Sequence, residues 1–173
     1  VINKTKIIYR KINMITFKNV IDDFSDIATN HYLINSFHSG FLDEVDINKL
    51  DQGDFPILYC EPGTATIDMG VLTYSFTIFV LDVLKEDLTN RNEVWTNTLQ
   101  ITQDIIAEFR QNLALQTSGG DSGKKLSYVP NEAVLDLPIS AEPFTARFAN
   151  ILTGFSATMS IQVNNTNNIF FFF

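Results

Sequence analysis

The stretch Val71–Leu84, with the sequence VLTYSFTIFVLDVL, decides the fold because it carries two hydrophobic patterns in one run. In its first half, apolar side chains alternate with Thr and Ser, which predicts a strand with one buried and one solvated face. In its second half both faces are apolar, which is typical of a sheet centre or of a contact between subunits. The candidate residues for a subunit contact are Ile78, Phe79, Val80 and Leu81.

This predicted strand is also long. At about 3.3 Å per residue it would span about 46 Å, whereas most strands have about 5–6 residues. A strand of this length can extend beyond its domain as one side of a β-hairpin arm. Upstream, Phe55–Cys60 is predicted to be a short apolar strand, which Ala65–Asp68 continues or pairs with after Pro62-Gly63.

An amphipathic helix is predicted over residues 16–30, with Thr16 or Asn13 as its N-cap. Its apolar side chains recur at helical spacing and should pack on the sheet. They are Phe17, Val20, Ile21, Phe24 and Ile27. The opposite face is expected to be solvated and acidic, with Asp22, Asp23 and Asp26.

A longer helix is predicted over Glu93–Leu113, where Asn90 and Glu93 have the spacing of a capping box. We expect this helix to lie on the sheet along one apolar stripe, which neighbouring apolar positions widen. The stripe consists of Trp95, Leu99, Ile106, Phe109 and Leu113, widened by Val94, Ile101 and Ile105.

The remaining segments add short strands. Residues 35–47, Leu126–Val129, Ala133–Leu137 and Gly154–Val163 have strand-like patterns, whereas Glu142–Leu152 is predicted to be a loop or a short helix. Runs of strands separated by helices favour an α+β fold. We therefore expect a mostly antiparallel sheet with a long β-hairpin, flanked by two main helices.

Composition excludes several classes of protein. The chain has 173 residues, of which 45% are hydrophobic and 18% charged, which suits one folded domain rather than a disordered chain. Residues 1–13 carry four basic side chains and no acidic one, so the other 160 residues carry 8 basic and 20 acidic ones, a balance of −12. An acidic body should repel nucleic acid and anionic lipid. No apolar run approaches the roughly 20 residues of a membrane span.

The two ends of the chain are expected to be extensions of a domain over residues 14–163. Residues 1–13 form a basic extension, and Asn164–Asn168 has the composition of a linker. The last five residues, Ile169–Phe173, would be costly to leave in water, since burying one Phe contributes about 1.5–3 kcal/mol. They are expected to fold back on their own domain or to insert into a neighbouring subunit or partner. The candidate contact residues are Phe170, Phe171, Phe172 and Phe173.

No catalytic constellation is found. The loop Gln116–Lys125 contains GDSG, but a serine nucleophile needs a positioned base, and the serine follows a predicted helix in a polar loop. The same loop lacks the glycine spacing and the hydroxyl residue of a phosphate-binding loop. A linker between helix and strand is the favoured interpretation, so the sequence predicts no enzyme and no cofactor.

Metal and redox sites are not favoured either. The oxygen-rich run from Asp43 to Asp54 breaks the ligand spacing of a calcium loop, which favours a solvated turn. His31 and His38 have no third ligand at standard spacing, so no metal site is predicted. The single cysteine, Cys60, excludes an internal disulfide and is expected to be a core residue.

Three segments together resemble a group of small proteins of tailed bacteriophages. They are Glu142–Phe155, with the string PFTARFAN, the aromatic strand Tyr74–Asp82, and the helix that contains Leu99–Ile106. The resemblance covers about residues 14–163. The order of elements is also similar to that of the tail terminator and tail completion family, which has no catalytic residues to carry over.

The resemblance implies a structural virion protein, assembled in the host cytoplasm into a ring at the head-proximal end of a phage tail. Such a ring, often a hexamer, joins the tail tube to the neck. The implied partners are further copies of the chain, the tail tube and neck or connector proteins, with DNA only as passing cargo and no membrane. The alternatives are a neck or connector ring and a non-catalytic adaptor that binds one protein partner. The loop Gln116–Lys125 matches no motif of the family.

Overall fold

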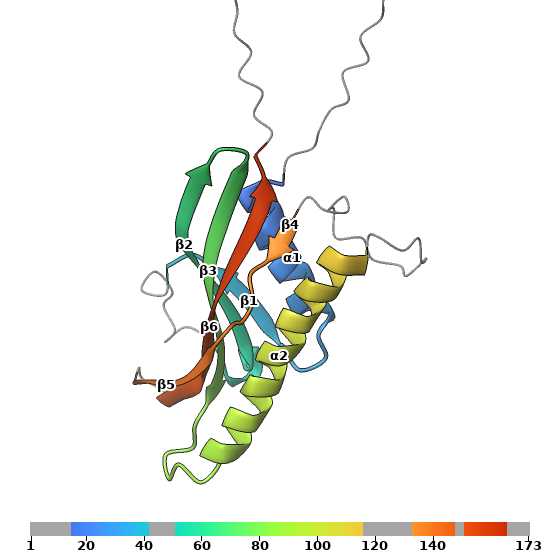
Figure 1. Cartoon of the computed structure of the whole chain (residues 1–173). Helices are drawn as coiled ribbons and strands as arrows, with labels where there is room; N and C mark the ends of the chain where they lie inside the picture. Colours follow the sequence, from blue (N-terminus) through green and yellow to red (C-terminus); the bar gives the residue numbers. More distant parts are fainter. Residues whose placement is uncertain (1–14, 42–50, 116–132, 148–150, 166–173) are drawn as a thin grey trace, which may run out of the picture.

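The computed structural model describes residues 15–41, 51–115, 133–147 and 151–165 (Figure 1). Within them, two α-helices, a short 3₁₀ helix and six strands follow one another along the chain. In order they are α1 (Phe17–Asn30), β1 (Ser36–Ser39), η3 (Gln52–Asp54), β2 (Ile57–Asp68), β3 (Val71–Val83), α2 (Arg91–Leu115), β4 (Ala133–Leu135), β5 (Ala141–Arg147) and β6 (Ile151–Asn164).

The six strands form one sheet in the order β1-β2-β3-β6-β4, and β5 pairs with the first half of β6. Only β1 and β2 run parallel; every other pair is antiparallel. Both helices pack on one face of this sheet, which Figure 1 shows as a layer of helices beside a layer of strands. The predicted α+β architecture with a mostly antiparallel sheet and a long hairpin is therefore confirmed.

The strand β3 lies in the middle of the sheet, between β2 and β6. Its even-numbered side chains from Tyr74 to Val80 are buried under the helices, as the alternating pattern predicts. Its odd-numbered positions lie on the other face, where Leu81 joins a second buried cluster. The doubly apolar end of this strand thus serves two clusters of the same chain, one on each face of the sheet.

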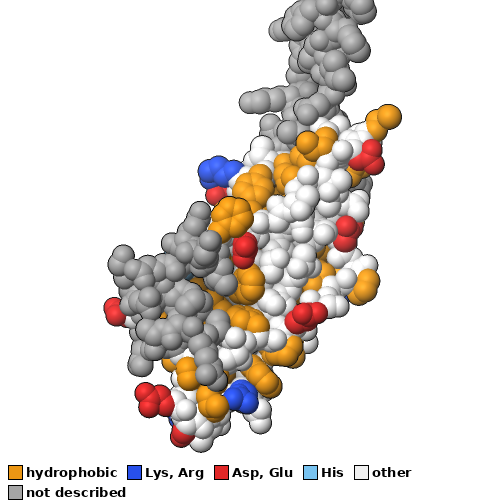
Figure 2. Space-filling model, turned by 90° about the vertical axis from the view of Figure 1, so that its left-hand side faces the viewer, with side chains coloured by type: hydrophobic (Ala, Val, Ile, Leu, Met, Phe, Trp, Pro, Cys, Tyr) orange, Lys and Arg blue, Asp and Glu red, His pale blue; other side chains and the backbone are white. Residues whose placement is uncertain are grey.

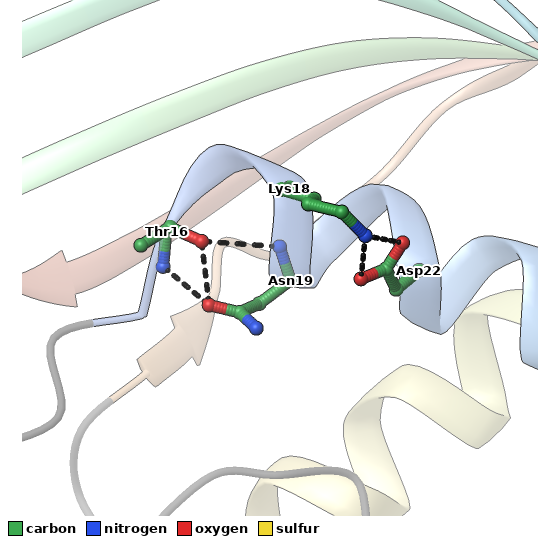
Figure 3. Close-up of polar contacts among 4 residues, drawn as sticks. All are labelled: Thr16, Lys18, Asn19 and Asp22. Atoms are coloured by element: carbon green, nitrogen blue, oxygen red, sulfur yellow. Dashed lines mark hydrogen bonds and ion pairs between the residues drawn. The ribbon is translucent and has the colours of Figure 1, made fainter.

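The helix α1 begins as predicted, with Thr16 as its N-cap (Figure 3). The Asn19 amide donates to Thr16 Oγ1 over 3.3 Å, and the Thr16 amide donates to Asn19 Oδ1 over 2.9 Å. Val20, Phe24 and Ile27 are buried against the sheet. The prediction that all three aspartates are solvated was wrong at Asp23, which is 6% exposed because it lies one position before Phe24 on the buried side.

The helix α2 forms where it is predicted, but its buried face is rotated. Thr98 and Thr102 are fully buried together with Ile101 and Ile105, and each threonine hydroxyl donates to the carbonyl four residues earlier. The predicted capping box is absent. The Asn90 side chain instead accepts a hydrogen bond from the Lys85 amide over 2.9 Å, which fixes the connection between β3 and α2.

Two predictions about strands change, and one that left two alternatives is resolved. The segment predicted as a loop or short helix, residues 142–152, contains β5 and the start of β6. Of residues 35–47, only Ser36–Ser39 is a described strand, and residues 42–50 lie outside the description. Ala65–Asp68 continues β2 after a register shift between Pro62 and Ala65, so one long strand forms the outer side of the hairpin.

A close contact between β3 and β6 depends on Gly154. A Cβ atom at this position would overlap the carbonyl oxygen of Val80 on the neighbouring strand. Gly154 lies opposite Leu81, beside the second buried cluster. Glycine is therefore required here by the approach of two backbones rather than by the conformation of a turn.

Candidate interaction surface

The turn of the β2–β3 hairpin lies at one end of the sheet (Figure 1), where β6 still pairs with β3 up to Val71. We call the part of the hairpin beyond Cys60, residues 61–77, the arm. β1 pairs with β2 only from Ile57 to Cys60. Beyond Cys60, no other strand of the described residues lies beside the outer edge of β2, and residues 63–70 are all exposed. We call residues 61–68 of β2, with this unpaired edge, the free edge.

The tip of the arm carries two exposed apolar side chains. Met69 is 96% exposed and Ile67 is 77% exposed, more than any other large hydrophobic residue described, Tyr32 alone equalling Ile67. The turn between the strands is Met69-Gly70, where Gly70 has a φ of 80°, and the Met69 amide donates to Asp68 Oδ1 over 2.6 Å. Together with the edge of β2 described above, these two side chains form a candidate interaction surface.

The backbone polarity of the free edge follows from the two-residue turn. The residues that flank such a turn, Asp68 and Val71, face each other as a hydrogen-bonded pair, and the pairs then alternate along the hairpin. Ala65 and Ile67 therefore direct their N–H and C=O groups away from β3, toward the free edge. This is the hydrogen-bonding pattern that an added strand requires.

The face of the sheet opposite the helices is rich in hydroxyl groups. Thr73, Ser75 and Thr77 of β3 lie beside polar residues of β6, and Thr77 Oγ1 is 3.3 Å from Thr158 Oγ1. The Gln162 side chain donates to Asp136 Oδ1 over 2.8 Å. Figure 2 shows a broad area that is neither hydrophobic nor charged, with hydrophobic and acidic side chains around it. The hydroxyl groups of this face can form hydrogen bonds.

The second buried cluster closes the base of this open face. It contains Phe55, Ile57, Tyr59, Leu81 and Leu152, with Phe79, Val83 and Phe144 packed against it. The rings of Phe79 and Phe144 meet edge to face with their centroids 5.5 Å apart. The Tyr59 hydroxyl donates to the Phe41 carbonyl over 2.7 Å. The cluster thus draws residues from β2, β3, β5 and β6 into one contact.

Three of the four strand residues predicted to contact another subunit are used inside the chain itself. Ile78 and Val80 are fully buried under the helices, and Leu81 is 2% exposed in the second cluster. Only Phe79 keeps part of its surface. These three side chains offer no surface to a partner because the two faces of the sheet are both covered at this end.

The other predicted contact residues, Phe170, Phe171, Phe172 and Phe173, lie outside the described residues. The same holds for the basic segment 1–13, for the glycine-rich loop 116–125 and for most of the acidic run, namely residues 43–50.

A polar group lies where α2 begins, on the helix side of the sheet. The Trp95 indole donates to Thr153 Oγ1 over 2.8 Å, and the Arg91 guanidinium lies 5.9 Å from the centre of that indole ring. Burial raises the pKa of the Asp82 carboxyl, a hydrogen bond from the Val83 amide opposes this rise, and the charge of Glu93 adds to it. Among the described residues, no side-chain hydrogen bond joins the Asp82 carboxyl to a nucleophile or a base.

His31 and Cys60 are engaged in structural contacts. His31 Nε2 lies 3.3 Å from Asp104 Oδ2, and His31 Nδ1 accepts a hydrogen bond from the Leu33 amide over 3.2 Å. Both ring nitrogens of His31 are therefore engaged in contacts within the chain. Burial raises the pKa of the Cys60 thiol to about 12, so this cysteine is unreactive at neutral pH. The described residues hold no cluster of three metal-ligating side chains.

The free edge and the tip of the arm are the features that sequence reasoning missed. A hairpin arm is predicted from the length of β3, but Ala65 and Ile67 are given no role. The available signal was the segment from Pro62 to Gly70, in which Ala65, Ile67 and Met69 alternate with Thr66 and Asp68.

Neither described helix has both the length and the apolar character that crossing a bilayer requires. No protein-family model matches the sequence, and a search of curated proteins finds no significant relative.

Proposed function

We propose that this chain is a structural subunit that assembles with further copies of itself and has no catalytic role. The observation that carries the proposal is the arm, where no other described strand pairs with the outer edge of β2 and where Ile67 and Met69 are exposed at the tip. A monomeric protein normally covers or blunts such an edge, because it is a template for pairing with another chain. Self-association would cover both the edge and the apolar tip.

The more specific proposal is a ring at the head-proximal end of a phage tail, where it joins the tail tube to the neck. It rests on the resemblance of Glu142–Phe155 and of the element order to tail terminator and tail completion proteins. The arrangement of two helices on one face of a sheet with a long hairpin supports it, as does an arm suited to reach a neighbouring copy. The proposed ring is a homo-oligomer, for instance a hexamer, located in the virion.

The charge of the chain supports a ring through which DNA passes. The 160 residues after the basic segment 1–13 carry a balance of −12. A negatively charged lumen repels the phosphate backbone and so lets DNA move without binding. A basic lumen in an assembled ring would contradict this part of the proposal.

Native mass spectrometry combined with negative-stain microscopy of the full chain tests the proposal. We expect a single closed oligomer and ring-shaped particles, since a repeated contact between unlike surfaces closes into a ring. If the chain forms a ring but binds a portal or connector rather than a tail tube in pull-down experiments, the neck or connector alternative is correct. If the full chain stays monomeric up to high concentration and also in the presence of purified tail tubes, self-assembly is wrong and an adaptor function replaces it.

A further inference from the structure

We propose that the segment Ile169–Phe173 of one copy adds as a strand to the free edge of β2 in a second copy. The inference rests on the proposed self-assembly and specifies the contact through which it occurs. It joins a strand edge with which no other described strand pairs to a segment whose composition favours burial.

The free edge fits an added strand in its hydrogen bonding. Ala65 and Ile67 direct their backbone N–H and C=O groups outward, so a five-residue segment beside them can form a ladder. Side chains alternate between the two faces along such a strand. Phe170 and Phe172 would lie on one face, and Phe171 would lie on the other with Ile169 and Phe173.

The surroundings of the free edge fit aromatic side chains. Ile67 lies on the helix side of the hairpin, in register with Leu72, which is half-buried there. Phe17, at the start of α1, is 41% exposed and its ring lies 5.9 Å from that of Tyr74, the next residue on this side of β3. Phenylalanine side chains of an added strand would extend this partly covered apolar surface instead of entering water.

The reach of the chain favours a second copy over the same copy. The Asn165 amide donates to the Gly70 carbonyl over 2.9 Å, so the chain leaves β6 at the turn of its own hairpin. To lie outside β2, it would have to cross three strand spacings, about 14 Å. The four steps from Asn165 to Ile169 span at most about 14 Å when fully extended. Its own edge is therefore at the limit of reach, with no residue left to reverse direction, whereas the edge of a neighbour imposes no such limit.

Disulfide trapping between single-cysteine variants tests the contact. One chain carries Ile67→Cys, and another, with a different affinity tag, carries Phe170→Cys or Phe171→Cys. The two positions in the segment sample its two faces. The native Cys60 is buried and unreactive, so it serves as an internal control. Residues opposite each other on paired strands have the Cα separation that a disulfide needs.

We expect a covalent heterodimer when the two variants are co-expressed and mildly oxidised, with one of the two segment positions clearly preferred. Parent chains and variants mixed with the parent should give none. If the disulfide forms only within a chain that carries both cysteines, the segment binds its own copy and the proposal is wrong. If neither arrangement cross-links while the parent still forms a closed ring, the contact is wrong but the proposed function stands. A strictly monomeric parent chain would overturn both.

Two variants of the free edge give an independent measurement. Ala65→Pro removes one outward N–H donor and is compatible with an edge strand. We expect it to weaken association by about three- to tenfold, which is the effect of one lost hydrogen bond. Ala65→Ser keeps the donor and should associate like the parent chain. Equal association of both variants, measured by sedimentation while circular dichroism confirms the fold, would contradict strand addition.

Discussion

The two halves of β2 share one strand and one ladder with β3, yet they differ in almost every other respect. Ile57–Cys60 lies between two strands with both faces covered, and all four side chains are buried. Residues 63–68 are exposed and, among the described strands, have a neighbour on one side only. Backbone pairing is common to both halves, so it is the burial of apolar side chains that separates the stable base from the arm. The base holds the fold, and the arm is free to bind.

The largest effect on the base is expected from Gly154→Ala. Because the added methyl group would overlap the Val80 carbonyl, β6 must move away from β3 along the longest pairing in the sheet. We expect a loss of about 5 kcal/mol in the free energy of unfolding, or no folded protein. Gly53→Ala, at a glycine with no atom near the new methyl group, is the matched control in urea unfolding. Equal stability of the two variants would show that the strands separate easily.

The next effect is expected from Phe76→Ala on the helix side of β3. This ring is fully buried and contacts the rings of Phe17 and Phe24, with centroids 5.2 Å and 5.6 Å away. Its removal leaves a cavity between the sheet and α1, so the free energy of unfolding should fall by about 3–5 kcal/mol. Chemical denaturation measures the change. A loss below about 1 kcal/mol would mean that α1 collapses into the space.

A smaller effect is expected from Asp82→Asn, and it should depend on pH. The pKa of Asp82 is raised by burial above its ordinary value of 3.8, so the unfolded chain ionises this group first. The free energy of unfolding of the parent chain therefore falls as the pH rises from 3.8 to the raised pKa of the folded chain. The asparagine variant has no carboxyl group at this position and does not lose this stability. Because the group is partly solvated, we expect less than about 1 kcal/mol.

Urea unfolding at pH 3.5 and pH 7 tests Asp82→Asn. Relative to the parent chain, this variant should gain free energy of unfolding only at the higher pH. Asp87→Asn is the control of opposite sign. Hydrogen bonds from Thr89 lower the pKa of Asp87. The Asp87→Asn variant should therefore become less stable relative to the parent chain as the pH rises. If Asp82→Asn and the parent chain differ in stability by the same amount at both pH values, the ionisation of Asp82 does not contribute to the pH dependence of stability.

The smallest effect on stability is expected in the arm. Replacing both Ile67 and Met69 with Ser removes exposed side chains, so the free energy of unfolding should change by no more than about 0.5 kcal/mol. Association should nevertheless be lost or strongly weakened, as measured by native mass spectrometry. A variant that unfolds easily but still assembles would reverse the roles that we assign to base and arm.

Local pattern was sufficient where one residue type repeats at the period of one element. The alternation in Val71–Leu84 and in Gly154–Val163 predicts β3 and β6, and the helical spacing after Thr16 predicts α1 with its cap. It was insufficient for β5, where Pro143 and mixed polarity conceal a strand that exists because it pairs with β6. Asp23 and Asn90 were misjudged because their environments come from packing and from the connection after β3, which no local pattern encodes.

The sequence by itself determined an acidic, single-cysteine α+β chain with a long hairpin, because composition and periodicity are properties of the chain. Only the tertiary structure decided that Ile78, Val80 and Leu81 belong to two internal clusters and that no other described strand pairs with the outer edge of β2 beyond Cys60. The physical reason is that a buried strand end and a subunit contact have the same hydrophobic pattern. What covers each face depends on strands and helices that are distant in the sequence.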